Sequence, residues 1–338
     1  MTSTPTCPTG NEHFLPPWYF RNGHLQTLAG MYIYAPLSIR KQFWPNTTRT
    51  GEVLLSDGDR LIYQDDCPTD WQPGDRVALL LHGLGGSHAS PYLSRIARQL
   101  NKNNTRTFRL DWRGCGAGAG LARYPYHSGR SDDLSATVSE IVALCPDSPI
   151  SLVGFSLGGN VTLKLLGETS ASVGHLSTID RAIAICPPID LNFTVKSMQK
   201  GLGRLYDRYF CQNCTRDVYL RQRQALKAVI PEGWFSRRPR TLYEFDETFT
   251  APVCGFESAS DYYAKSSANQ FLEAITVPTL VIAAQDDPLI PFSQFRVASY
   301  SATTKLLSPR HGGHLGFCTT QGQGWMDKQI IEWIVGKL

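Results

Sequence analysis

Ser156 is the residue whose setting most clearly suggests chemistry, because glycines stand two positions before and two positions after it, at Gly154 and Gly158. A serine hydroxyl is a weak nucleophile at neutral pH and must be held clear of its own backbone, beside a base and near hydrogen-bond donors for an oxyanion. A sharp strand-to-helix turn achieves this, and residues without a Cβ fit best at its two flanking positions. Ile150–Val153 before Ser156 predicts the strand, and Val161–Leu166 predicts the helix, so the segment predicts a nucleophile elbow rather than a chance match.

Two acids and two histidines follow Ser156 in the chain order that a triad of this kind requires, acid first and histidine last. Asp286 and Asp287 follow one strand-like apolar run, and His311 and His314 follow the next. An acid at the carboxyl end of a parallel strand lies where active-site groups collect. We choose Asp287, because of the proline that follows it at fixed spacing, and His314, because two glycines directly before it let its loop fold over the serine. Asp286 and His311 remain reserve candidates.

An oxyanion hole needs two backbone N–H donors, and we expect them at Leu157 and Leu84. In this architecture the residue after the nucleophile provides one donor, and a loop after an earlier strand provides the other. The glycine-rich segment His82–Gly86 follows the first central strand and contains Leu84. His82 is expected to support this loop rather than to act as a base.

The elements that must position these residues alternate between short apolar runs and helical periodicities. Continuous apolar runs such as Val77–Leu81 are typical of strands in a parallel sheet that is covered on both faces. The alternation predicts an α/β fold with a mostly parallel, doubly wound sheet and helices on both faces. The predicted strands are Glu52–Leu55 and Arg60–Gln64, paired as a hairpin across an Asp-Gly turn, then Val77–Leu81, Thr107–Leu110, Ile150–Val153, Arg181–Ile185, Thr279–Ala283 and Lys305–Leu307; the predicted helices are Ser90–Gln99, Ser131–Leu144, Val161–Leu166 and one near the C-terminus.

The alternation of strands and helices is interrupted once, between Pro187 and about Asn269. We expect residues 1–50 to form an N-terminal arm packed on the core, residues 51–338 to form one α/β domain, and residues 188–269 to form a helical cap inserted over the sheet. Apolar residues recur at helical spacing in the cap, at Val195, Met198, Leu202, Leu205, Tyr206 and Tyr209.

This apolar stripe in the cap allows two interpretations. The favoured one is a helix that buries an ordinary apolar face on the core, and the alternative is an acyl-binding lid above Ser156. The same stretch is basic and could attract anionic head groups or a membrane surface. A solvated polar helix face is the favoured interpretation of these charges.

Several segments spread from Asn22 to the last helix resemble the YheT-like branch of the α/β-hydrolase superfamily. The elbow occurs throughout the superfamily, whereas the arm motif together with the closing glycine–histidine loop is far more specific. The resemblance implies the α/β-hydrolase fold, an esterase or acyl hydrolase activity, and a charge-relay triad of Ser156, Asp287 and His314. Related eukaryotic members are linked to medium-chain esters, phospholipids and acyl transfer to alcohols. The segments are Asn22–Thr27, His82–Ser87, Asp111–Cys115, Tyr126–Gly129, Gly154–Asn160, Asp261–Tyr263, Asp286–Pro288 and His311–Phe317.

The composition argues against several other classes of protein. A formal net charge of +4 is too small to indicate a nucleic-acid partner. No apolar run is long enough to span a bilayer, and residues 1–10 do not resemble a secretory signal, so we expect a cytoplasmic protein with reduced cysteines. Cys211 and Cys214 form an isolated CxxC, for which we expect no zinc or redox role. No metal or organic cofactor is expected.

The sequence therefore predicts a serine hydrolase that cleaves carboxylic esters with short- to medium-chain acyl groups through an acyl-enzyme intermediate. Its partner would be a small-molecule ester, which could be lipid-like. Two alternatives remain open: an acyltransferase that uses the same triad, and a non-catalytic binding module on the same scaffold. A zinc hydrolase using His311 and His314 lacks the helical HExxH context. The sequence identifies neither the substrate-binding residues nor the oligomeric state.

Overall fold

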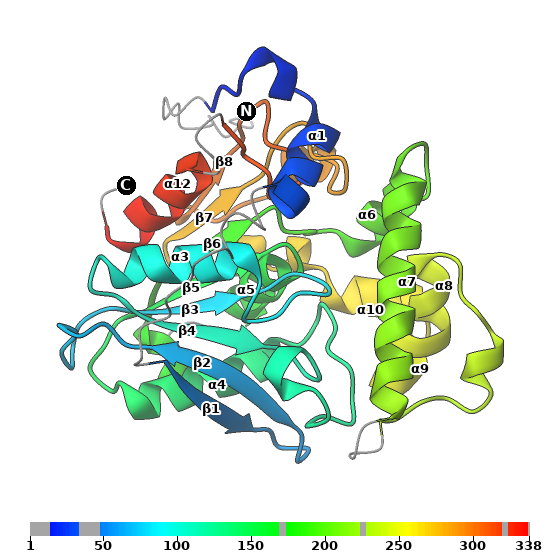
Figure 1. The fold of residues 1–338 in the computed structure, drawn as a ribbon, viewed down its shortest axis with the longest axis horizontal. Coiled ribbons are helices and arrows are strands. Elements are labelled where there is room, and N and C mark those ends of the chain that lie inside the picture. The colour runs from blue at the N-terminus through cyan, green and yellow to red at the C-terminus, as the bar shows by residue number, and fades with distance from the viewer. Residues whose placement is uncertain (1–13, 34–47, 169–173, 224–227, 320–323, 337–338) are drawn as a thin grey trace.

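The computed structural model describes residues 14–33, 48–168, 174–223, 228–319 and 324–336, arranged around one eight-stranded sheet of order β1-β2-β4-β3-β5-β6-β7-β8 (Figure 1). Strands β3 to β8 run parallel to one another, whereas β2 is antiparallel to both β1 and β4. The predicted strands are confirmed, with bounds shifted by a few residues. They are β1 (Arg49–Leu54), β2 (Arg60–Asp66), β3 (Val77–Leu81), β4 (Arg106–Asp111), β5 (Ile150–Phe155), β6 (Ile179–Ile185), β7 (Thr279–Ile282) and β8 (Thr304–Leu307).

Helices cover both faces of this sheet, which confirms the doubly wound α/β architecture. Successive residues of a strand point to opposite faces. Leu80 of β3 accordingly packs in one core with α3 (Pro91–Asn101) and α12 (Gly324–Ile334). Its neighbours Leu79 and Leu81 pack in the other core with α4 (Ser131–Leu144) and α5 (Leu157–Glu168). Burial on both faces explains why β3 is a continuous apolar run.

In the described part of the chain, five α-helices lie between β6 and β7, beyond the end toward which β3 and β4 point (Figure 1). The second, third and fourth of these helices share a small core around Trp234 and Phe249. The first and the last pack into the main core of the sheet instead. We call this group the cap; its predicted bounds, 188–269, stay a prediction. Its helices are α6 (Leu191–Met198), α7 (Gly203–Gln222), α8 (Leu242–Phe245), α9 (Ala251–Cys254) and α10 (Ala259–Ser266).

The apolar stripe of the cap is divided between two helices, because the chain turns at Gly201 with a φ of 51° between α6 and α7. Val195 and Met198 are buried, as the favoured interpretation expected. Leu202 and Leu205 are 61% and 68% exposed, so the expectation of one buried apolar face is wrong for this half of the stripe. The spacing alone cannot show that the helix breaks and that its second half turns away from the core.

The described part of the N-terminal arm contains α1 (Gly23–Leu28), between a short 3₁₀ helix (Trp18–Phe20) and a short π-helix (Ala29–Ile33). The Gln26 side-chain amide makes two hydrogen bonds to the backbone of Cys318. It donates to the carbonyl at 3.1 Å and accepts from the N–H at 2.6 Å. Residues 1–13 and 34–47 of the predicted arm lie outside the described residues, so its full extent stays a prediction. No helix in the described ranges is long and apolar enough to cross a membrane.

Candidate active site

Ser156 occupies the junction between β5, which ends at Phe155, and α5, which begins at Leu157. Its φ is 51°, a left-handed conformation that a serine adopts only when its surroundings enforce it. A Cβ at Gly154 would lie 2.5 Å from the carbonyl oxygen of Gly158, and a Cβ at Gly158 would lie 2.6 Å from the carbonyl oxygen of Leu81. The glycines around the serine are therefore required by close backbone approach, as the elbow motif predicts.

His314 lies between Ser156 and Asp287 and connects them. Its Nε2 is 3.0 Å from Oγ of Ser156, and its Nδ1 is 2.9 Å from Oδ2 of Asp287. The other carboxylate oxygen of Asp287 accepts hydrogen bonds from the backbone N–H groups of Leu289 and Ile290 at 2.8 and 3.0 Å. A carboxylate fixed in this way holds the imidazole with Nδ1 protonated and Nε2 facing the serine hydroxyl. This geometry suits general-base activation of a serine.

The reserve candidates form a separate pair that does not reach the serine. Asp286 Oδ2 lies 3.3 Å from Nδ1 of His311, and Asp286 Oδ1 accepts the backbone N–H of Gly313 at 2.9 Å. Burial raises the pKa of the Asp286 carboxyl. The pair connects the loop that carries His314 to the end of β7. From the sequence alone, this structural role could not be distinguished from a catalytic role at the serine.

Helix α1 supports His314 from the N-terminal side, a role that the sequence analysis did not assign. The backbone N–H of His314 donates to Oγ1 of Thr27 at 2.8 Å, and the same hydroxyl donates to the carbonyl of Gly23. At Gly313 (φ 56°) a Cβ would lie 2.3 Å from the carbonyl oxygen of Gly23. The arm thus fixes the loop carrying the histidine, which explains why Asn22–Thr27 and His311–Phe317 stand out together in the sequence.

The loop that carries Leu84 lies directly against the serine. A Cβ at Gly83 would lie 3.0 Å from Cβ of Ser156. The N–H groups on either side of Leu84 are already bonded: Gly83 donates to the Tyr92 hydroxyl at 3.1 Å, and Gly85 donates to the Tyr126 hydroxyl at 2.8 Å.

The backbone N–H of Leu84 donates to no described residue, and Leu157 begins α5, where an N–H has no intrahelical acceptor. Both N–H groups therefore remain available for an oxyanion, although their role stays a prediction.

His82 supports the Leu84 loop from within the core. Its side chain is fully buried, and burial lowers its pKa to about 4, so the ring is neutral. Nδ1 donates to the carbonyl of Gly83 at 2.7 Å, and Nε2 accepts the backbone N–H of Trp112 at 3.3 Å. With both nitrogens occupied, His82 has no free position from which to act as a base.

Asn160, one turn into α5, joins the elbow to the core and the cap. Its amide donates to the carbonyls of Ser128 and Ser266 at 2.9 and 2.8 Å and accepts the N–H of Ala268 at 3.0 Å. Tyr262 of α10 adds a further link, because its hydroxyl accepts the N–H of Ser128 at 3.0 Å. The sequence analysis used Asn160 only as part of a motif and did not anticipate this role.

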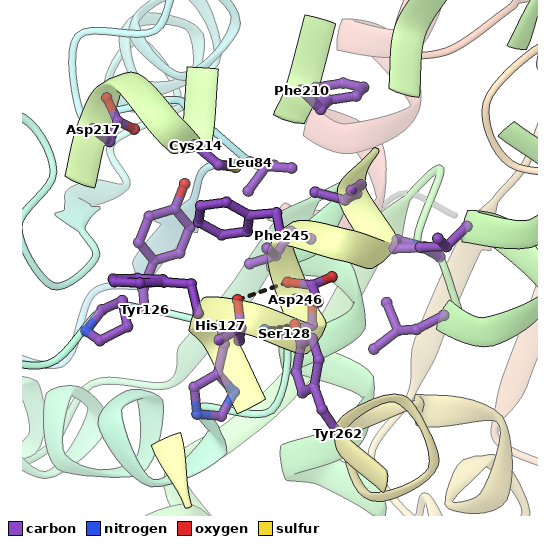
Figure 2. Close-up of a pocket in the computed structure, with 18 of the residues that line it drawn as sticks. Leu84, Tyr126, His127, Ser128, Phe210, Cys214, Asp217, Phe245, Asp246 and Tyr262 are labelled. Carbon is purple, nitrogen blue, oxygen red and sulfur yellow. Dashed lines mark hydrogen bonds between the residues drawn. The ribbon is translucent and has the colours of Figure 1, made fainter. Parts of the chain in front are cut away.

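Two cavities meet at Ser156. The first, of about 140 Å³, lies between the serine and the cap and is lined mostly by apolar side chains, among them Val195, Met198 and Phe245. Figure 2 shows Leu84, Phe210 and Phe245 among the side chains that line it. We call it the inner chamber.

The second cavity, of about 590 Å³, also reaches His314 and lies between α1, the Leu84 loop and α7. We call it the outer cavity. Ser156 therefore lies where a reacting ester could place its two halves in two different spaces.

Asp246 is a buried carboxyl in the lining of the inner chamber. It accepts hydrogen bonds from the hydroxyls of Thr250 and Tyr263, both at 2.6 Å. Burial nevertheless raises its pKa to about 6. The Asp246 carboxyl therefore binds its proton more tightly in the folded protein than in the unfolded chain.

We expect the pKa of Asp246 to make folding less favourable as the pH rises. The stabilisation that comes from protonated Asp246 is fully present below about pH 4, the ordinary pKa range of the carboxyl. It is lost as the pH rises through about 6. Relative to Asp246→Asn, the free energy of unfolding of the wild type should fall by about 2–3 kcal/mol between pH 4 and pH 7. Urea unfolding of both proteins across this range measures the difference. If the free energy of unfolding of the wild type relative to Asp246→Asn stays constant or rises with pH, the raised pKa of Asp246 is contradicted.

Cys186 approaches the triad and raises the question of a metal. Its thiol, Asp287 and His314 place potential ligand atoms within 4.8 Å of one another, the one such grouping in the described ranges. Asp287 and His314 already bond to each other, and burial raises the pKa of the Cys186 thiol well above its usual range. A protonated thiol is a poor metal ligand, so this chemistry does not fit a metal centre. Cys211 and Cys214 lie on α7, where burial raises the pKa of both thiols.

Comparison with known proteins identifies relatives of this chain. The model of a family described as alpha/beta hydrolase fold matches residues 77–319. The YheT protein of Escherichia coli strain K12, which is named as an esterase, is 30% identical over 96% of this chain and 94% of its own length. The medium-chain fatty acid ethyl ester synthase/esterase 2 of Saccharomyces cerevisiae is 26% identical over 76% of this chain and 61% of its own length. In fold, the chain resembles the esterase Pf2001 of Pyrococcus furiosus, with a TM-score of 0.58 at 17% identity over 88% of this chain and 94% of that one.

Proposed function

Since this chain belongs to the α/β-hydrolase fold family, within its YheT-like branch, we propose that it is a serine esterase that cleaves carboxylic esters through an acyl-enzyme on Ser156. The observation that carries the proposal is the continuous hydrogen-bonded chain from Ser156 through His314 to Asp287. A binding module has no need of such a chain, nor of a serine held at a φ of 51°.

In the acylation step, Nε2 of His314 takes the hydroxyl proton of Ser156 while Oγ attacks the ester carbonyl carbon. The backbone N–H groups of Leu157 and Leu84 would stabilise the resulting oxyanion. The bond between the carbonyl carbon and the alcohol oxygen then breaks, and His314 passes its proton to the departing alcohol. Water, activated by the same nitrogen, then attacks the acyl carbon. The bond from this carbon to Oγ breaks, His314 returns the proton to Ser156, and the carboxylic acid leaves. Asp287 stabilises the imidazolium that forms in each half of the reaction.

The two cavities suggest how the ester is oriented. The inner chamber is enclosed by the cap and mostly apolar, which suits an acyl chain. The outer cavity is larger and contains His314, which must reach the departing alcohol. We therefore place the acyl group in the inner chamber and the alcohol in the outer cavity. With the ester in this orientation, the small volume of the inner chamber favours short- to medium-chain acyl groups.

A series of p-nitrophenyl esters from acetate to dodecanoate tests both the activity and this orientation. We expect turnover, and we expect Val195→Phe to lower the ratio of kcat/KM for octanoate to that for acetate by about 10–100-fold, because the larger side chain fills the inner chamber. Val297→Phe is a matched control, since Val297 is 84% exposed and lines neither cavity. Absence of turnover contradicts the proposed activity, and an unchanged ratio contradicts the orientation alone.

Transfer of the acyl group to an alcohol is a second candidate function. The outer cavity of about 590 Å³ offers room for an alcohol beside Ser156 and His314, and the yeast relative above is named as both a synthase and an esterase. The ratio of ester to acid products with and without added ethanol separates the two. Acid alone at high ethanol concentration excludes transfer.

A further inference from the structure

Large apolar side chains gather, exposed, around the mouth of the outer cavity. They come from two segments far apart in the sequence, the N-terminal arm and the start of α7, and each lines the cavity that reaches Ser156 and His314. Single exposed apolar residues are common on protein surfaces, but their concentration around one opening marks an interaction site. We call this group the mouth rim; it consists of Leu28, Met31, Leu202, Leu205 and Tyr209.

The two sides of the mouth rim are joined to each other. The Nδ1 atom of His24 in α1 lies 3.0 Å from the hydroxyl of Tyr206 in α7, and the two rings stack with their centres 5.7 Å apart. This contact joins the arm to the cap. The apolar side chains of both segments therefore belong to one surface.

The chain that carries the cap side of the rim is strongly basic. Between Phe193 and Tyr209 the sequence contains a single acidic residue, Asp207. Asp207 is buried and accepts the backbone N–H of Leu242 at 2.7 Å, so it does not face solvent. The basic side chains of the same stretch are exposed: Lys196, Lys200, Arg204 and Arg208.

We propose that the mouth rim docks on an anionic lipid surface, with Leu202, Leu205 and Tyr209 entering the apolar layer and the basic side chains meeting the head groups. Apolar side chains beside exposed lysines and arginines are the combination with which peripheral proteins bind such surfaces. An acidic protein partner would match the charges but would not need an opening to the serine at the centre of the patch. Docking would place the outer cavity on the lipid, so that an ester could enter without crossing water; this consequence rests on the proposed function, whereas the docking itself does not.

Flotation with lipid vesicles tests the docking, using the Ser156→Ala protein so that hydrolysis plays no part. We expect binding to phosphatidylglycerol vesicles, weaker binding to phosphatidylcholine vesicles, and a loss of binding as salt is raised. The double variant Leu202→Ser/Leu205→Ser should reduce binding to the anionic vesicles by at least about tenfold. Leu54→Ser is its matched control, because Leu54 is 67% exposed but lies on β1.

The charge of the surface is tested by Lys200→Glu/Arg204→Glu, built both with and without Ser156→Ala. In the Ser156→Ala protein we expect at least about a tenfold loss of binding to anionic vesicles. With Ser156 present we expect unchanged kcat/KM for p-nitrophenyl acetate, which reaches the site from water. Lys102→Glu, at the end of α3, should bind as the parent does.

Three results would overturn the proposal of a lipid surface. They are equal binding to both kinds of vesicle, unchanged binding by the rim variants, and dimerisation that depends on Leu202 and Leu205 without vesicle binding. The last result would assign the rim to a second copy of the chain. Failure of the esterase activity would leave the vesicle results unaffected, so the two proposals can fail separately.

Discussion

Replacing Ser156 with alanine should lower kcat/KM for p-nitrophenyl esters by at least about 10⁴-fold, because no other group can form the acyl-enzyme. His314 and Asp287 keep their positions in this variant, since neither depends on the serine hydroxyl for its other contacts. A fluorophosphonate probe should label the wild type on Ser156 and leave the variant unlabelled, as intact-mass measurement would show.

The same substitution should leave folding almost unchanged. Alanine and serine experience the same steric cost at a φ of 51°, and the 3.0 Å contact to His314 is the one side-chain hydrogen bond from Oγ to a described residue. Circular dichroism and the urea midpoint should therefore match those of the wild type. A variant that folds normally and retains a tenth or more of the activity would exclude Ser156 as the nucleophile.

Asp287→Asn should reduce kcat/KM by about 10⁴-fold, the scale expected when the acid behind a catalytic histidine becomes an amide. An asparagine that keeps the Leu289 and Ile290 hydrogen bonds through its oxygen presents its amide N–H groups to Nδ1. The imidazole then protonates on Nε2 instead, the nitrogen that must accept the serine proton.

Asp286→Asn is the matched comparison, one residue away in the chain. Its oxygen can still accept from Gly313, and its partner His311 does not contact Ser156, so we expect less than about a tenfold loss of kcat/KM. Steady-state kinetics on one soluble ester measures both variants. Similar losses in the two would mean that the acids act as one unit and that the assignment to Asp287 is wrong.

The sequence predicted the sheet well because its central strands are buried on both faces and leave a continuous apolar signal, as in Val77–Leu81. The elbow was predictable because the close approach of Gly154 to the backbone of Gly158 involves residues on the same short segment of the chain. Such local constraints can be inferred from a single chain.

Other features depend on contacts between distant segments and left no local signal. The antiparallel placement of β2 beside β4 is one. The choice between Asp286 and Asp287 depends on which carboxylate faces His314, and neighbouring residues on a loop give no periodicity from which to infer direction. The support of His314 by Thr27 joins residues 287 positions apart.

That last contact has a consequence for how the protein is made. Synthesis proceeds from the N-terminus, so α1 and the elbow emerge from the ribosome long before the loop that carries His314. Until that loop is made, Ser156 has no base beside it and Thr27 of α1 lacks its contact with His314. Competence for acyl chemistry therefore requires the loop that carries His314, which emerges 287 residues after Thr27, to dock on α1.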